Sequence, residues 1–142
     1  MGQGLYRMLA YGTMDVPREL INEDLNNWKQ IEDTAPKKVR DGYSWATINT
    51  SYEAESPYIG IPLAVDDGFL QEWWQLPDLP YEAIRNQVSP RRVVIAVVKN
   101  PPRDIAAAIA MTKTDWLKIQ AMAKKLGHRL GHGRLLLVCD WD

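Results

Sequence analysis

The stretch from Val93 to Val98 constrains the fold more than any other part of the sequence. Its six consecutive residues are all apolar, and turns containing proline, Ser89-Pro90 and Asn100-Pro101-Pro102, bound it on both sides. A short apolar run that does not alternate with polar residues indicates a strand buried on both faces. We therefore expect a strand over residues 91–99 at the centre of a sheet.

Other segments rich in aromatic and β-branched residues predict further strands. Pro62 lies inside one of them and cannot donate a ladder hydrogen bond, so that strand should lie at an edge or contain a bulge. Residues 104–111 are ambiguous, because their alanines favour a helix whereas their alternating apolar residues suit a strand, and we favour the strand. The remaining strands are expected over residues 5–11, 43–51, 58–65 and 134–141.

Two amphipathic helices are predicted from apolar residues at helical spacing. The first has Asp15 as its N-cap and Pro17 in its first turn, and it ends at Pro36. Its buried stripe is expected to contain Ile21, Leu25, Trp28 and Ile31.

The second amphipathic helix should begin at Thr112 or Thr114 and end at Leu126, with Gly127 as its C-cap. Its buried stripe is expected to contain Trp116, Ile119, Met122 and Leu126. Two short helices are expected over residues 69–75 and 80–88.

The order of these elements predicts an α+β fold, because strands and helices do not alternate regularly. The chain has 142 residues, of which 46% are hydrophobic and 25% are charged, as in ordinary globular domains. We expect a single domain over residues 1–142. It should contain a mixed or antiparallel sheet of about five or six strands, two longer helices and two short ones.

Composition and charge limit the compartment and the partners. A single cysteine, Cys139, excludes an internal disulfide, and the sequence has no apolar run near the ~20 residues that span a bilayer. We therefore expect a cytoplasmic protein without membrane contact. The net charge of −1 argues against a large nucleic-acid footprint, although residues 1–75 are acidic and residues 76–142 are basic. That asymmetry suits either a basic binding face or two halves that attract each other.

A basic cluster beside three glycines is the first candidate site. Glycine lets backbone N–H groups approach an anion, and arginine binds phosphate oxygens through two N–H groups. The cluster could therefore hold a phosphate-bearing ligand, or it could simply form a solvated turn. Its members are Lys124, Lys125, His128, Arg129, His132 and Arg134, and its glycines are Gly127, Gly131 and Gly133.

The adjacent pair Trp73-Trp74 is the second candidate site. Neighbouring positions on a helix point about 100° apart, so both rings are not expected to fit in one small core. Together with Phe69 and Tyr81 they would form an aromatic face that binds a protein partner, a second copy of the chain or a ring-bearing ligand. Trp28, Trp45 and Trp116 are instead expected to pack in the core.

The sequence contains no phosphate loop, no dinucleotide-binding glycine pattern and no nucleophile elbow. Four aspartates, Asp66, Asp67, Asp140 and Asp142, are interpreted as helix caps and strand ends, and we predict no metal site and no cofactor. We favour a non-catalytic binding protein for a protein partner or a small phosphate-bearing ligand. The alternative is a small enzyme acting on a phosphate ester or nucleotide, with His128 or His132 as acid–base group, Arg129 or Arg134 on the phosphate, and Asp66 or Asp140 holding a metal or a proton.

Overall fold

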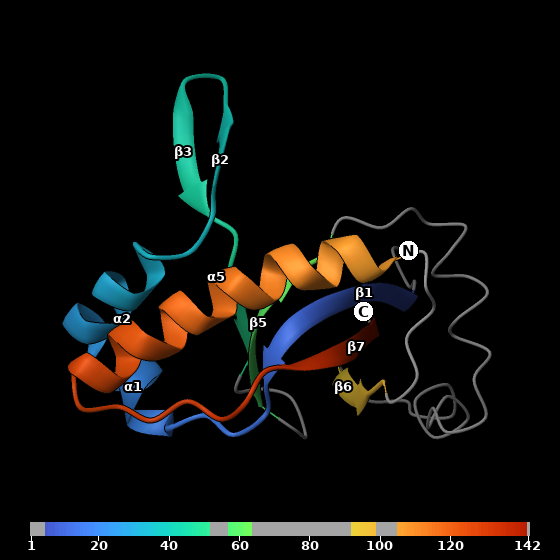
Figure 1. Cartoon of the computed structure of the whole chain (residues 1–142). Coiled ribbons are helices and arrows are strands. Elements are labelled where there is room, and N and C mark those ends of the chain that lie inside the picture. Colours follow the sequence, from blue (N-terminus) through green and yellow to red (C-terminus); the bar gives the residue numbers. More distant parts are fainter. Residues whose placement is uncertain (1–4, 52–56, 64–91, 99–104, 142) are drawn as a thin grey trace.

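The computed structural model describes residues 5–51, 57–63, 92–98 and 105–141, which form two antiparallel sheets and three helices (Figure 1). The α+β class predicted from the sequence is therefore confirmed. The strands are β1 (Leu5–Thr13), β2 (Lys37–Arg40), β3 (Tyr43–Ala46), β4 (Asn49–Ser51), β5 (Tyr58–Pro62), β6 (Arg92–Val97) and β7 (Arg134–Trp141). The helices are α1 (Arg18–Asn22), α2 (Leu25–Glu32) and α5 (Ala106–Lys125).

The main sheet has the strand order β4-β5-β1-β7-β6, and every neighbouring pair is antiparallel. The central strand β1 pairs with β7 along its length, with Leu5 opposite Trp141 and Gly12 opposite Arg134. The first and last elements of the described chain are thus joined at the middle of the sheet. The second sheet is the hairpin of β2 and β3.

The three helices cover one face of the main sheet, and α5 lies across β1 and β5 (Figure 1). The main core lies between them, because Leu20 of α1, Ile31 of α2 and Ile119 of α5 are fully buried against sheet residues such as Tyr11 and Ile59. On the opposite face a second cluster of buried residues contains Ala10, Tyr58, Leu136 and Val138.

The first predicted helix is in fact two helices. Asp24 interrupts the segment, and its side chain caps α2 by accepting a hydrogen bond from the backbone N–H of Asn27. Leu25 therefore begins a new helix and is 61% exposed, so the prediction that it is buried was wrong. Asp15 is not an N-cap either, because α1 begins after Pro17 without a side-chain cap.

Residues 106–111 belong to helix α5, so the predicted strand over 104–111 was wrong. Intrinsic helix propensity of the alanines prevails over the alternating apolar pattern. The hydroxyls of Thr112 and Thr114 donate to the carbonyl groups of Ala108 and Ala110, so neither threonine is the N-cap. The end of the helix was predicted correctly, since Gly127 follows it with a φ of +89°.

Three strand predictions also need correction. β6 is the last strand in the order of the main sheet rather than its centre, and the strand next to the middle is β7, which carries the buried run from Leu135 to Val138. The segment 43–51 divides into β3 and β4, which lie in different sheets. β5 is an inner strand, and Pro62 lies opposite Ala10 of β1 on one side, whereas β4 on the other side reaches only as far as Gly60.

The two short helices predicted over 69–75 and 80–88 lie outside the described residues. The three tryptophans predicted to pack in the core differ in their exposure to solvent. Trp116 is buried as expected and Trp28 packs at the core's edge, whereas Trp45 is 44% exposed. Of the helices that the structure describes, none combines the length and the apolar character needed to cross a membrane.

Candidate functional site

The structure describes one of the two predicted sites. Arg129 and His132 lie in the connection between α5 and β7, Arg134 is the first residue of β7, and all three line the same groove. The four aromatic residues of the other predicted site lie outside the described residues, and they are Phe69, Trp73, Trp74 and Tyr81.

The connection from Gly127 to Gly133, here called the basic loop, is held firmly to the core at its middle. The side chain of Leu130 is buried in the main core. The side-chain amide of Gln120, on α5, donates to the carbonyl groups of Leu130 and Gly131 at 3.2 and 3.1 Å. The backbone N–H of Gly131 donates to the carbonyl of Asp15 at 3.3 Å. The loop is therefore a fixed platform between α5 and the end of β1.

Two glycines allow this close contact. A Cβ atom at Gly131 would lie 2.5 Å from the Thr13 hydroxyl oxygen and 2.9 Å from Asp15 Cβ. A Cβ atom at Gly133 would collide with the rings of Tyr11 and Trp116. Gly131 and Gly133 therefore allow the backbone of the basic loop to pack closely against β1 and α5.

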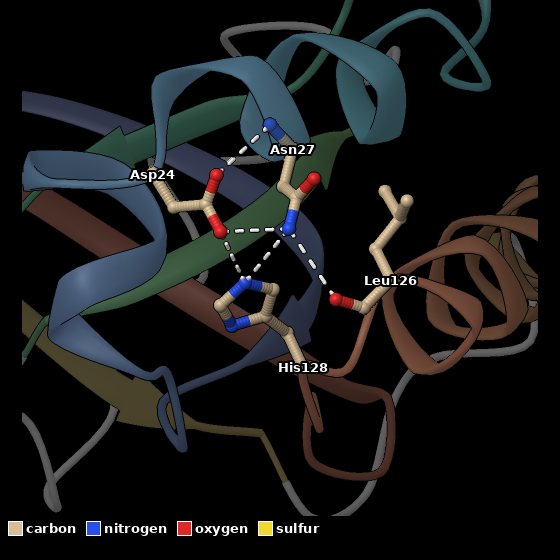
Figure 2. A network of polar contacts seen from close by, with 4 residues as sticks. All are labelled: Asp24, Asn27, Leu126 and His128. Carbon is tan, nitrogen blue, oxygen red and sulfur yellow. Dashed lines mark hydrogen bonds and ion pairs between the residues drawn. The ribbon is translucent and has the colours of Figure 1, made fainter.

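His128 belongs to a polar network that joins the basic loop to the start of α2 (Figure 2). Its Nε2 atom lies 3.0 Å from Asp24 Oδ2. Since a carboxylate oxygen only accepts, this contact places the proton on Nε2. The Asn27 amide then donates to Asp24 at 2.7 Å and to the Leu126 carbonyl at 3.3 Å, and its proximity to His128 is not a second hydrogen bond to that nitrogen.

This network shifts the titration of Asp24. The hydrogen bond from His128 is the largest cause that lowers the pKa of the Asp24 carboxyl, and the hydrogen bonds from Asn27 act in the same direction. The side chain of His128 is only 12% exposed. These contacts hold the basic loop against the start of α2. They differ from the alternative prediction, in which His128 acts as an acid–base group.

The groove beside the basic loop has a volume of about 1070 Å³, which is the size of a pocket for a small ligand. Val97, Leu117 and Ala121 give it an apolar wall from β6 and from one side of α5. Its charged and titratable lining residues are Asp15, Lys124, His128, Arg129, His132 and Arg134.

The groove is basic because its cations outnumber its acids and are not neutralised locally. Lys124, Arg129 and Arg134 carry positive charge, whereas Asp15 is the acid that the lining contributes. Within the part of the chain that the structure describes, none of these three cations forms an ion pair. Lys125, the neighbour of Lys124 in the last turn of α5, is exposed and does not line the groove.

The histidines and arginines of the alternative catalytic site line one groove, but Asp140 stands apart from them. Arg134 and Asp140 stand at opposite ends of β7, and the rise of a strand separates them by roughly 20 Å. Asp66 lies outside the described residues. Among the residues that are described, no three His, Cys, Asp or Glu side chains lie close enough together to hold a metal ion.

Several lining residues carried no sequence signal. Thr13 ends β1, Asp15 follows it, and Gln120 occupies an ordinary position on α5, so only the folded arrangement brings them to the basic loop. Leu117, Ala121 and Lys124 lie at helical spacing, on the stripe of α5 next to its buried stripe. This spacing is the sequence signal from which the α5 side of the groove could have been predicted.

A scan against protein-family models found no match, and comparisons with curated proteins and with solved structures found none either.

Proposed function

We propose that this protein is a non-catalytic binding protein that holds a small phosphate-bearing ligand in the groove beside the basic loop. One observation carries the proposal: Lys124, Arg129 and Arg134, none of them ion-paired within the described residues, line one groove of ligand size. Charge-assisted hydrogen bonds from such groups to phosphate oxygens are among the stronger polar contacts in proteins.

The two sides of the groove suit the two parts of such a ligand. The cations and His132 would contact the phosphate group, and the wall of Val97, Leu117 and Ala121 would cover an apolar or ring-bearing part. The carbonyl end of α5 carries partial negative charge, which disfavours an anion on the helix axis. Lys124 offsets that charge, so the phosphate is expected on the side of the groove nearer the arginines.

A binding function agrees better with this geometry than hydrolysis does. His128 is hydrogen-bonded to Asp24, and Asp140 stands near the other end of β7 from Arg134. The groove therefore offers charge and shape, while the His128–Asp24 pair at its lining holds the basic loop to the start of α2. A protein partner or self-association through Trp73 and Trp74 remains a separate proposal, and it predicts weaker assembly without loss of stability in Trp73→Ala and Trp74→Ala.

The first experiment is native mass spectrometry on gently purified protein, which shows a retained ligand by its mass. The chain is then titrated calorimetrically with inorganic phosphate and with a panel of nucleotides. Lys124→Ala should weaken binding by about tenfold or more, because a hydrogen bond to a charged group contributes ~1.5–3 kcal/mol.

Lys125→Ala is the matched control, because it removes the same charge from the adjacent exposed position. It should leave the affinity almost unchanged. Arg134→Ala should behave like Lys124→Ala. The proposal fails if no phosphate compound binds at millimolar concentration, or if Lys124→Ala and Lys125→Ala weaken binding equally.

A further inference from the structure

The hairpin of β2 and β3 projects away from the helices and the main sheet (Figure 1). Its strands are joined by Asp41-Gly42, whose φ angles of +54° and +82° fit the two-residue turn typical of tight hairpins. Every residue from 37 to 45 is exposed, and none belongs to a described core cluster. The hairpin is therefore a surface element that contributes little to the packed core.

Its side chains are large for such an exposed position. Val39 is 71% exposed and Tyr43 is 78% exposed, and Trp45 is also open to solvent. An isolated two-stranded hairpin is only marginally stable in water, and aromatic rings are favoured in binding surfaces. Both rings lie outside the described core clusters, which favours a role in contact with another molecule.

The register of the hairpin sorts its side chains into two distinct faces. Lys38 lies opposite Trp45, and Arg40 lies opposite Tyr43. Because opposite residues share a face and faces alternate along a strand, these four side chains lie on one face. The other face carries Lys37, Val39, Ser44 and Ala46.

On the first face the cations and the rings form two parallel rows. β2 contributes Lys38 and Arg40, and β3 contributes Tyr43 and Trp45. Strand geometry separates members of one row by roughly 7 Å and the two rows by roughly 5 Å. A nucleic-acid strand has the same division, with phosphates along one edge and flat bases along the other.

We propose that the face formed by Lys38, Arg40, Tyr43 and Trp45 binds single-stranded nucleic acid, with the cations on phosphates and the rings stacked on bases. Arg40 lies 3.8 Å from Asp41, but both side chains are more than four-fifths exposed, so this ion pair holds the guanidinium weakly. The site spans only a few nucleotides, which agrees with a chain whose net charge is −1. An acidic peptide would satisfy the cations but lacks a matching row of flat rings.

The test is fluorescence anisotropy with a labelled ten-nucleotide thymidine oligomer and the full-length chain at low salt. The logarithm of the affinity should fall with the logarithm of salt with a slope of about −1.4, as expected for two phosphate contacts on a single strand. Tyr43→Ala and Trp45→Ala should each weaken binding by about fivefold or more, because stacking contributes at least that much per base. Lys38→Gln should weaken it comparably.

Lys37→Gln is the matched control, since it removes the same charge from the opposite face of the same strand. It should bind almost as the unchanged protein does. Amide NMR shifts on adding the oligomer should be confined to residues 37–46, which locates the site independently of any variant.

Four results would overturn the proposal. They are no binding at 100 μM protein, equal affinity for polyglutamate and the oligomer, tighter binding of the same sequence as a duplex, or a concentration-dependent dimer that Trp45→Ala abolishes. The second indicates an acidic protein partner, and the last indicates a second copy of this chain. None of these results bears on the groove beside the basic loop, because the two sites share no residue.

Discussion

At the scale of single residues, Asp24 links two segments that are distant in the sequence. It caps α2 through Asn27 and accepts a hydrogen bond from His128 more than a hundred residues later (Figure 2). The hydrogen bond joins a residue of the acidic half of the chain to one of the basic half. A cap residue inside an amphipathic pattern is difficult to recognise in the sequence. The helical spacing of apolar residues runs from Ile21 before Asp24 to Leu25 and Trp28 after it.

The Asp24 network predicts how stability changes in acid. Hydrogen bonding from His128 lowers the pKa of Asp24 in the folded state below its unfolded value of about 3.9. Asp24 therefore stabilises the fold above about pH 4, and this contribution is lost as the pH falls through the folded-state pKa. Urea unfolding of the unchanged protein and of Asp24→Asn should differ at pH 6 and converge toward pH 2.5.

Asp33→Asn is the control for the loss of a carboxylate, because the Asp33 ion pair with Lys37 is long, at 3.7 Å, and exposed. It should change the free energy of unfolding little at either pH. A difference between Asp24→Asn and the unchanged protein that persists undiminished at pH 2.5 would contradict the assigned role of Asp24.

At the scale of elements, the sequence predicted which segments form helices and strands more accurately than it predicted where each of them lies in the fold. The helix ending at Gly127 and the strand from Arg134 follow from local signals, namely the apolar spacing and a glycine C-cap. The position of β6 does not, because an apolar run indicates burial and not strand order. β7 holds the comparable run Leu135–Val138, and only pairing with β1 places it further inside the sheet.

Helix α5 gives a direct test of which face is buried. Ile119 is fully buried in the main core, whereas Leu117 is 56% exposed beside the groove. Ile119→Ala should lower the free energy of unfolding by ~2–5 kcal/mol, as removal of a buried aliphatic side chain does. Leu117→Ala should change it by no more than ~0.5 kcal/mol. Chemical denaturation measures both, and equal effects would mean that the helix is rotated from the described orientation.

At the scale of the whole molecule, the groove is built from three separate parts of the chain. The end of β1, Val97 of β6, and the continuous stretch from α5 through the basic loop to the start of β7 meet there. The sequence identified the basic loop, because histidine, arginine and glycine concentrate in it and Lys124, Lys125 and Arg134 flank it. It could not identify the opposite wall, because the position of β6 beside β7 decides that wall and is a long-range property.

The hairpin of β2 and β3 is the second feature that is visible only in the folded structure. The sequence suggested one strand over 43–51 and a buried Trp45, since aromatic residues usually mark the core. The structure instead pairs β3 with β2, away from the main sheet, and leaves that ring exposed. The molecule thus presents two separate positively charged surfaces, each with a different accompanying apolar component.

The most direct test of the central claim is amide NMR mapping of the full chain during titration with inorganic phosphate and with ATP. If the groove holds a phosphate-bearing ligand, the shifts should concentrate at residues 120–124 and 127–134, and Lys124→Ala should reduce them while Lys125→Ala does not. Shifts spread evenly over exposed lysines, or confined to the hairpin, would contradict the assignment of the groove as the ligand site.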